Sequence, residues 1–117
     1  MVYDAKLGMH TFEAKQVVDA THPAVVLSMK VKANQGELPI GLIVTKDDNG
    51  ELIPFERGST KEPVGVLTNT VDTSKETVAS VLVHGTVVAK ALLVKQETTF
   101  QQANANEIAA LKLIFAI

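Results

Sequence analysis

Short apolar runs separated by clusters of turn residues recur along most of the chain. Four of them, rich in valine, isoleucine and leucine, cover residues 24–32, 38–45, 51–55 and 64–69. This composition and spacing are typical of β-strands. The sequence KDDNG lies between the second and third runs, and its Asn-Gly pair favours a tight hairpin turn. The pattern therefore predicts a fold built mainly of short strands.

The longest apolar run is VASVLVHGTVVAKALLV at 78–94, which contains a His84–Gly85 pair and Lys90. It is too short to span a membrane as a helix, and these polar residues interrupt it. An isolated glycine inside a strand marks a bulge or a sharp bend, so we expect a strand that bends at Gly85. Pro54 has no backbone N–H to donate, so its strand is expected at a sheet edge or a bulge.

The C-terminal segment changes from strand-like to helical spacing. Asn104 or Asn106 is a candidate N-cap, and Glu107 would favour the helix dipole from the first turn. Ile108 and Leu111 follow at helical spacing, and the final IFAI is expected as a short strand. We therefore expect a mainly β, barrel-like or sandwich-like domain with one short C-terminal helix. An α+β arrangement is the alternative.

Residues 1–22 alternate apolar and polar positions without a clear period. Such a segment is typical of an arm that orders only on a partner. Residues 12–18 fit equally well a first edge strand packed on its own domain. We expect no secretory signal, because a basic region followed by an apolar run is missing. The chain is thus divided into an arm, 1–22, and a single β-rich domain, 23–117.

Composition narrows the possible classes of function. The 117 residues include no cysteine, which excludes disulfides and thiolate chemistry. A net charge of −2, no tryptophan and a single arginine argue against binding to nucleic acid. Apolar residues make up 46% and charged residues 21%, which suggests apolar surface left for contact with another chain. The alternative is an alanine- and valine-rich core beneath an ordinary surface.

A search for chemistry finds no convincing site. The three histidines, His10, His22 and His84, lie far apart and lack metal-ligand spacing. Residues 45–56 resemble a calcium loop in part, but Thr45 replaces the first acid and the flanks are strand-like. A hairpin turn explains this segment without a metal. Nucleotide-binding and hydrolase motifs are also missing, so we expect no enzyme activity, no cofactor and no metal.

The second half of the chain resembles the lambda-type head decoration, or capsid cementing, proteins of tailed bacteriophages, and also the base domains of phage head fibres. In that family a Val-Gly-Val-Leu strand, a polar stretch, a long strand with glycine, a small apolar run, and a closing helix and strand follow one another. The matching segments here are Val64–Leu67, Val71–Asp72, Val81–Gly85, Ala89–Val94 and Ile108–Ile117. The first half follows the family only in its order of elements. Residues 1–22 and the hairpin at 47–50 depart from it.

The resemblance implies a homotrimer, made in the host cytoplasm, that binds the major capsid protein on the outside of the expanded head. There it would stabilise the virion against internal DNA pressure, without nucleic-acid or membrane contacts. His84 and Gly85 would lie near the trimer interface. Capsid contacts would come from apolar residues of the arm: Val2, Tyr3, Leu7, Met9 and Phe12. The alternative is a small β-barrel binding or adaptor module that recognises a peptide or a glycan.

Overall fold

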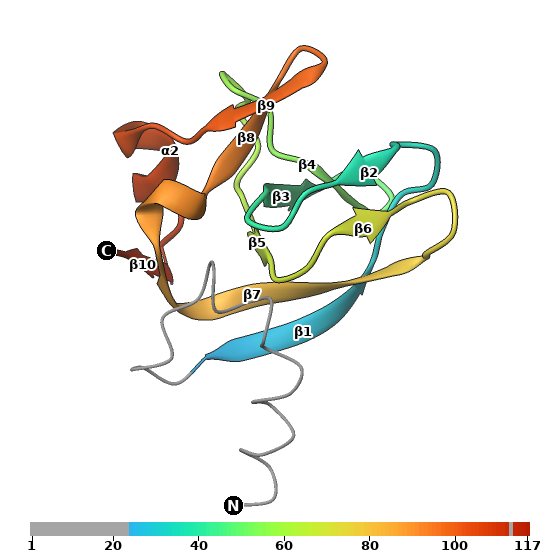
Figure 1. Cartoon of the computed structure of the whole chain (residues 1–117), viewed down its shortest axis with the longest axis horizontal. Helices are drawn as coiled ribbons and strands as arrows, with labels where there is room; N and C mark the ends of the chain where they lie inside the picture. Colours follow the sequence, from blue (N-terminus) through green and yellow to red (C-terminus); the bar gives the residue numbers. More distant parts are fainter. Residues whose placement is uncertain (1–23, 113) are drawn as a thin grey trace, which may run out of the picture.

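The computed structural model describes residues 24–112 and 114–117, and its backbone is mostly extended (Figure 1). The described residues form the strands β1 (Val25–Lys30), β2 (Glu37–Leu38), β3 (Ile43–Lys46), β4 (Leu52–Pro54), β5 (Gly65–Leu67), β6 (Val71–Asp72), β7 (Val78–Val87), β8 (Leu93–Gln96), β9 (Thr99–Gln102) and β10 (Ile114–Ala116), the 3-10 turn η2 (Ala89–Ala91) and the helix α2 (Ala105–Ala109). The fold is therefore mainly β with one short helix near the C-terminus, as the sequence pattern predicts.

One sheet organises the domain. Its strands follow the order β1-β7-β5-β3-β4, and each neighbouring pair is antiparallel. The short β10 pairs in parallel with the end of β7, where Ile114 lies opposite Gly85. Two small sheets, β2-β6 and β8-β9, lie apart from this path. β7 therefore pairs with three strands, β1, β5 and β10, and connects them within the sheet.

Buried apolar side chains form two clusters, one on each face of the central strands. The first core cluster comprises Ile43, Phe55, Val66, Leu82, Val87, Leu92, Val94, Ala103, Leu111 and Ile114. The second core cluster comprises Val31, Leu38, Leu42, Val44, Leu52, Leu67, Val71, Ala79 and Val81. Neighbouring residues of one strand, such as Val66 and Leu67, thus enter different clusters because successive side chains point to opposite faces. A sheet covered on both faces explains why these strands read as continuous apolar runs.

The single strand expected at 38–45 is wrong, because two separate strands occupy this run. Leu38 ends β2, and β3 begins at Ile43. Between them, Pro39 has no N–H for a strand partner, and Gly41 takes a positive φ of 88°. The N–H of Gly41 donates to the carbonyl of Leu67 at 2.9 Å, which holds the turn against β5.

The long run at 78–94 also contains more than one element. β7 ends at Val87, and the turn η2 precedes β8. The sequence predicts a bulge or a bend at Gly85; the register with β1 skips Val83, two residues earlier, and Gly85 itself has a φ of 145° where β7 passes from β1 to β10. The chain leaves the sheet at Ala89, whose N–H donates to the carbonyl of Ile117 at 2.9 Å. The reading of one strand through residue 94 is therefore wrong.

Three local predictions are confirmed. Pro54 lies in β4, which is the last strand of the main sheet. The turn at 46–50 joins β3 to β4, and the N–H groups of Asn49 and Glu51 both donate to Asp47 Oδ1 at 2.9 Å. Asn104 is the N-cap of α2, and together with Glu107 it forms a capping box. In the described part of the chain, no helix has the length and apolar character needed to cross a bilayer.

Candidate interaction surface

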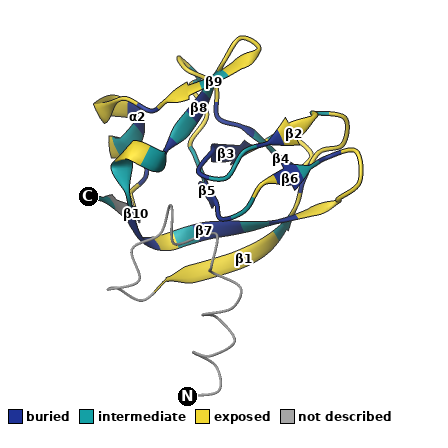
Figure 2. Cartoon of the chain, in the orientation of Figure 1, coloured by how far each residue is buried: buried dark blue, intermediate teal, exposed yellow. Residues whose placement is uncertain are grey.

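The strand β1 exposes its apolar side chains although it belongs to the main sheet (Figure 2). Val25, Val26 and Leu27 are 45%, 38% and 46% exposed, and Val78 at the start of β7 is 50% exposed. We call these four residues the edge surface. β1 ends the strand order, and among the described strands only β7 pairs with it. The edge surface therefore combines apolar side chains with a backbone edge that no second described strand pairs with, an arrangement that natural proteins usually protect.

A groove lies beside β7 and β10, which contribute Val83 and Ile114 to its lining. It has a volume of about 370 Å³ and is lined chiefly by Pro63, Val64, Val83, Leu111 and Ile114. The exposed ion pair between Lys112 and Glu62, with an Nζ–Oε1 distance of 3.3 Å, stands at its border. An apolar floor with charges at the border is suited to an apolar side chain of another molecule.

The residues predicted for the trimer interface have different environments. His84 is exposed on β7, opposite Val25 of β1, so its side chain borders the edge surface. Gly85 is buried, and a Cβ atom there would lie 3.4 Å from Cα of Ala24 and from Cδ1 of Leu82. These are ordinary contact distances, so the φ of 145° and not the packing is what favours glycine at this position, while the part of Gly85 in a trimer stays a prediction.

The predicted capsid-binding residues of the arm, Val2, Tyr3, Leu7, Met9 and Phe12, lie outside the described residues, as do His10 and His22. Their proposed contacts therefore stay predictions.

The turn that resembles a calcium loop is closed by its own hydrogen bonds. Besides the two bonds to Asp47 Oδ1, the N–H of Asp47 donates to the carbonyl of Glu51 at 2.9 Å. The backbone N–H of Glu51 has the largest effect and lowers the pKa of Asp47; desolvation opposes it, and the N–H of Asn49 lowers the pKa further. In residues 24–112 and 114–117, no three His, Cys, Asp or Glu side chains form a possible metal site.

The single arginine binds the helix cap. Arg57 donates from Nε to Glu107 Oε2 and from Nη2 to Glu107 Oε1, both at 3.2 Å, and from Nη2 to the carbonyl of Gln102 at 2.8 Å. The N–H of Asn104 donates to the same carboxylate at 2.8 Å. Burial by itself raises the pKa of Glu107, but the bonds from Arg57 and Asn104 and the Arg57 charge hold it below its ordinary value of 4.5. This network joins the 56–58 turn to β9 and α2, so its role is structural.

The Glu107→Gln variant is expected to lose about 1–2 kcal/mol of unfolding free energy at pH 7, because the amide cannot accept all three bonds. Since the folded pKa is lowered, the carboxylate stabilises the fold fully above the unfolded value of about 4.5. That contribution is lost as the pH falls through the folded pKa. The difference between wild type and variant should therefore shrink below about pH 4.5, which urea unfolding at several pH values can measure.

The matched control is Glu62→Gln, which removes the exposed pair with Lys112. Both side chains of this pair are more than 70% exposed, at 74% and 83%, so the expected loss is below about 0.5 kcal/mol at every pH. An equal loss in both variants would contradict the structural role of the Arg57–Glu107 pair.

Two features of the site are missing from the sequence predictions. The edge surface lies in the expected strand 24–32, and its signal is the uninterrupted Val25–Val26–Leu27 run, which places apolar side chains on both faces of an edge strand. The Arg57–Glu107 pair joins residues 50 positions apart, and its only local signal is the capping pattern of Asn104 and Glu107. No family model and no curated protein matches this chain.

Proposed function

We propose that this chain is a structural virion protein that binds the outside of the expanded head of a tailed bacteriophage as a homotrimer. The observation that carries the proposal is the edge surface, because an exposed, apolar, nearly uncharged patch is typical of protein–protein contact. The sequence resemblance to head decoration proteins supports it. Of the segments that carry the resemblance, Val64–Leu67 contains β5, Val81–Gly85 lies in β7 and Ile108–Ile117 contains β10.

The proposed action is to hold neighbouring major capsid subunits together. A trimer at a threefold or quasi-threefold position offers three identical contacts, and simultaneous contacts raise the overall affinity far above that of one. The arm would contribute by adding a strand to the capsid through Val2, Tyr3, Leu7, Met9 and Phe12, since added strands gain main-chain hydrogen bonds. The trimer would thereby resist the internal pressure of packaged DNA.

The proposal predicts binding that depends on the state of the head. Heads assembled from the major capsid protein of the phage that carries this chain are mixed with the protein, before and after expansion, and pelleted. We expect saturable binding to expanded heads, in a multiple of three chains, and none to unexpanded heads. Equal binding to both forms, or no binding to either, would contradict the proposal.

An arm variant makes this test more specific. The Leu7→Asp/Phe12→Asp double variant is expected to lose binding to expanded heads, because two apolar contacts become charged, while its mass in solution stays that of the wild type. Unchanged binding would remove the arm from the proposal and leave the capsid contact elsewhere.

The groove favours one alternative, a small binding module that recognises a peptide. Its volume of about 370 Å³ and apolar floor suit one or two side chains of such a partner. This alternative predicts a monomer or a dimer and no preference for expanded heads. The trimer proposal predicts a mass three times the 12.5 kDa of the chain, so light scattering after size exclusion separates the two.

A further inference from the structure

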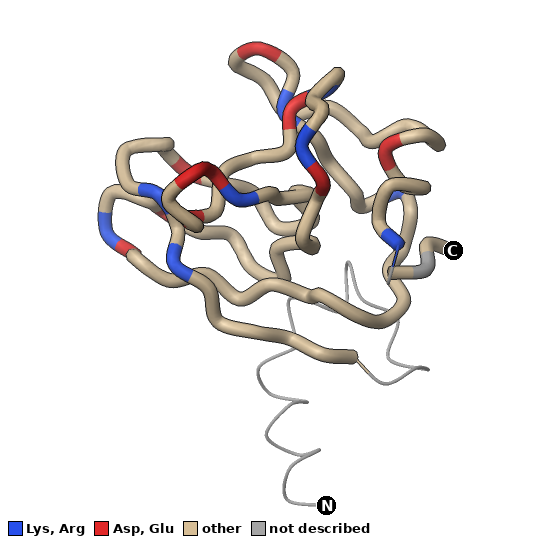
Figure 3. Tube along the Cα trace, turned by 180° about the vertical axis from the view of Figure 1, so that it is seen from behind, with Lys and Arg blue, Asp and Glu red and all other residues tan. Residues whose placement is uncertain are grey.

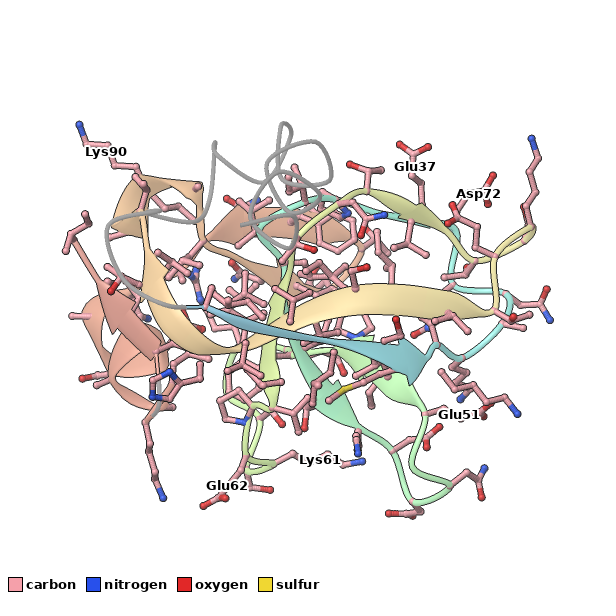
Figure 4. The ribbon with its side chains drawn as sticks, turned by 90° about the horizontal axis from the view of Figure 1, so that it is seen from below. Glu37, Glu51, Lys61, Glu62, Asp72 and Lys90 are labelled. Carbon is pink, nitrogen blue, oxygen red and sulfur yellow. The ribbon has the colours of Figure 1, made fainter. Side chains whose placement is uncertain are left out.

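The turn between β3 and β4 contains an asparagine that is followed by glycine, Asn49–Gly50. The chain has five asparagines, and the other four precede residues that carry a side chain. Asn49 and Gly50 are both exposed, and a Cβ atom at residue 50 would meet nothing within 4 Å. Figure 4 shows this connection, which ends at the labelled Glu51, projecting from the body of the domain. The side-chain amide of Asn49 thus lies in solvent beside a backbone nitrogen whose own residue adds no bulk.

An asparagine in this setting can react with its own backbone. The nitrogen of Gly50 forms a bond to Cγ of Asn49, its proton passes to the side-chain amide, and the Cγ–Nδ2 bond breaks with release of ammonia. Water then opens the cyclic imide at one or the other carbonyl carbon and leaves an aspartate or an isoaspartate at position 49. The reaction consumes only water. A following residue with a Cβ atom slows ring closure because it crowds the attacking nitrogen, and glycine has no such atom.

Hydrogen bonds within the turn oppose this reaction. The N–H of Gly50 donates to the carbonyl of Asp47 at 3.0 Å, and Asp47 Oδ1 accepts from the N–H groups of Asn49 and Glu51 at 2.9 Å each. Ring closure brings the nitrogen of Gly50 to Cγ of Asn49, so its bond to Asp47 must break first. Exposed turns open far more often than a whole domain unfolds. The bonds to Asp47 therefore slow the reaction without preventing it.

We propose that Asn49 is a site of spontaneous deamidation in the folded protein, and that Asp47 is the positioning residue that limits its rate. The reactive pair is exposed and unhindered, whereas the restraint comes from the hydrogen bonds to one side chain and its carbonyl. Opening of the turn and closure of the ring are therefore coupled through Asp47.

The isoaspartate product lengthens the backbone of the turn. Its chain runs through Cβ of residue 49, which adds a methylene to the connection between Lys46 and Leu52, a pair in the register of β3 with β4. The N–H groups that bind Asp47 Oδ1 are then spaced differently, so these bonds are weakened. Glu51 of the same turn forms an ion pair with Lys30 of β1 at 3.4 Å, and in Figure 4 it lies close to the end of that strand. The change would therefore loosen the hairpin where it contacts β1.

Both products also add a negative charge to an acidic turn. Asp47, Asp48 and Glu51 already lie in this segment, and Figure 3 shows that the acidic residues of the described chain lie mostly in such connections. Solvent and salt screen the repulsion between exposed charges. The added charge is therefore expected to have a small effect on stability, and the added methylene a larger one.

Peptide mapping by mass spectrometry tests the site. The full-length protein is incubated at mildly alkaline pH, folded or in urea, and conversion of amide to acid is followed at each of the five asparagines. In the folded protein we expect Asn49 to react faster than the other four, and in urea, where the turn is open, faster still. An Asn49 that stays intact in the folded protein, or that reacts no faster than another asparagine, would overturn the inference.

Variants of Asp47 test the restraint. Asp47→Ala removes both bonds to Oδ1 and should react at Asn49 roughly three- to tenfold faster than the wild type, the factor by which hydrogen bonds of this kind favour a closed turn. Asp47→Asn keeps an acceptor oxygen at the same place without the charge, so its rate should stay close to that of the wild type. Circular dichroism shows whether each variant folds. Equal rates in all three proteins, or equal acceleration in both variants, would contradict the role of the hydrogen bonds.

The stability of the product tests the effect on the hairpin. Ion exchange separates the isoaspartate form from the unreacted protein by its additional negative charge, and urea unfolding compares the two. The isoaspartate form is expected to unfold at a lower urea concentration. Asn49→Asp is the matched control, since it carries the charge without the methylene, and it should unfold close to the wild type. Equal midpoints for the isoaspartate form and Asn49→Asp would contradict the proposed loosening of the hairpin. No phage head enters these measurements, so their outcome is independent of the proposed function.

Discussion

The Gly65→Ala variant is expected to lose about 4 kcal/mol or more of unfolding free energy, an effect large enough to abolish folding. β5 passes so close to β7 that a Cβ atom at residue 65 would overlap the carbonyl oxygen of Leu82 and lie 2.6 Å from Cγ1 of Val81. The oxygen belongs to the backbone of a central strand, so it cannot move without disturbing the pairing of Val66 with Leu82. Soluble yield and the urea midpoint measure the loss.

Gly50→Ala is the matched control for this close approach. Gly50 has a φ of 80°, but a Cβ atom there would meet nothing within 4 Å. The expected cost is therefore only the backbone strain of a left-handed residue, about 1–2 kcal/mol. If the two variants lost the same stability, the contact between β5 and β7 would not be the reason that residue 65 is glycine.

The Leu82→Ala variant is expected to lose about 3–4 kcal/mol of unfolding free energy. Leu82 is fully buried in the first core cluster, and its strand is bonded on both sides, to β1 and β5. Surrounding side chains can fill the space only in part when the strand is held in this way, so a cavity remains. Urea unfolding, compared with the wild type at the same protein concentration, measures the loss.

Ile117→Ala removes an apolar side chain that is 67% exposed, and it should change stability by less than about 0.5 kcal/mol. If Ile117→Ala and Leu82→Ala lost similar amounts of unfolding free energy, Ile117 would have to be covered in the folded protein. A small loss at Leu82 would mean that the first core cluster repacks around the missing atoms.

These variants separate folding from assembly. Gly65 and Leu82 stabilise the fold of the single chain. Gly65 lies at the contact between β5 and β7, and Leu82 belongs to the first core cluster. Val26 and Leu27 act on the edge surface, where substitution leaves both core clusters intact. If the proposed trimer forms, its loss in a folded edge variant, beside the loss of folding in a core variant, would assign assembly and folding to different residues.

Several parts of the fold were accessible from neighbouring residues alone. The hairpin at Asn49–Gly50 follows from turn chemistry, and the edge position of Pro54 follows from its missing N–H. Asn104 and Glu107 specify the start of α2 through bonds to each other's backbone. In each case the residues that determine the local structure lie within a few positions of one another in the sequence.

Element boundaries within apolar runs were harder to predict. Residues 38–45 and 78–94 each look like one strand, yet each contains two. The division depends on bonds to distant partners, such as Gly41 to Leu67 and Ala89 to Ile117. The apolar pattern of a run does not reveal where its backbone hydrogen bonds to distant segments begin or end.

The sequence by itself determined that this protein is a β-rich domain with a capped C-terminal helix, because those features arise from local propensity, turn chemistry and capping. Only the tertiary structure decided which strands are neighbours, and hence that β7 is central while β1 lies at an exposed edge. The same apolar composition is buried in β5 and exposed in β1. The difference comes from what packs against each strand, and those packing partners are distant in the sequence.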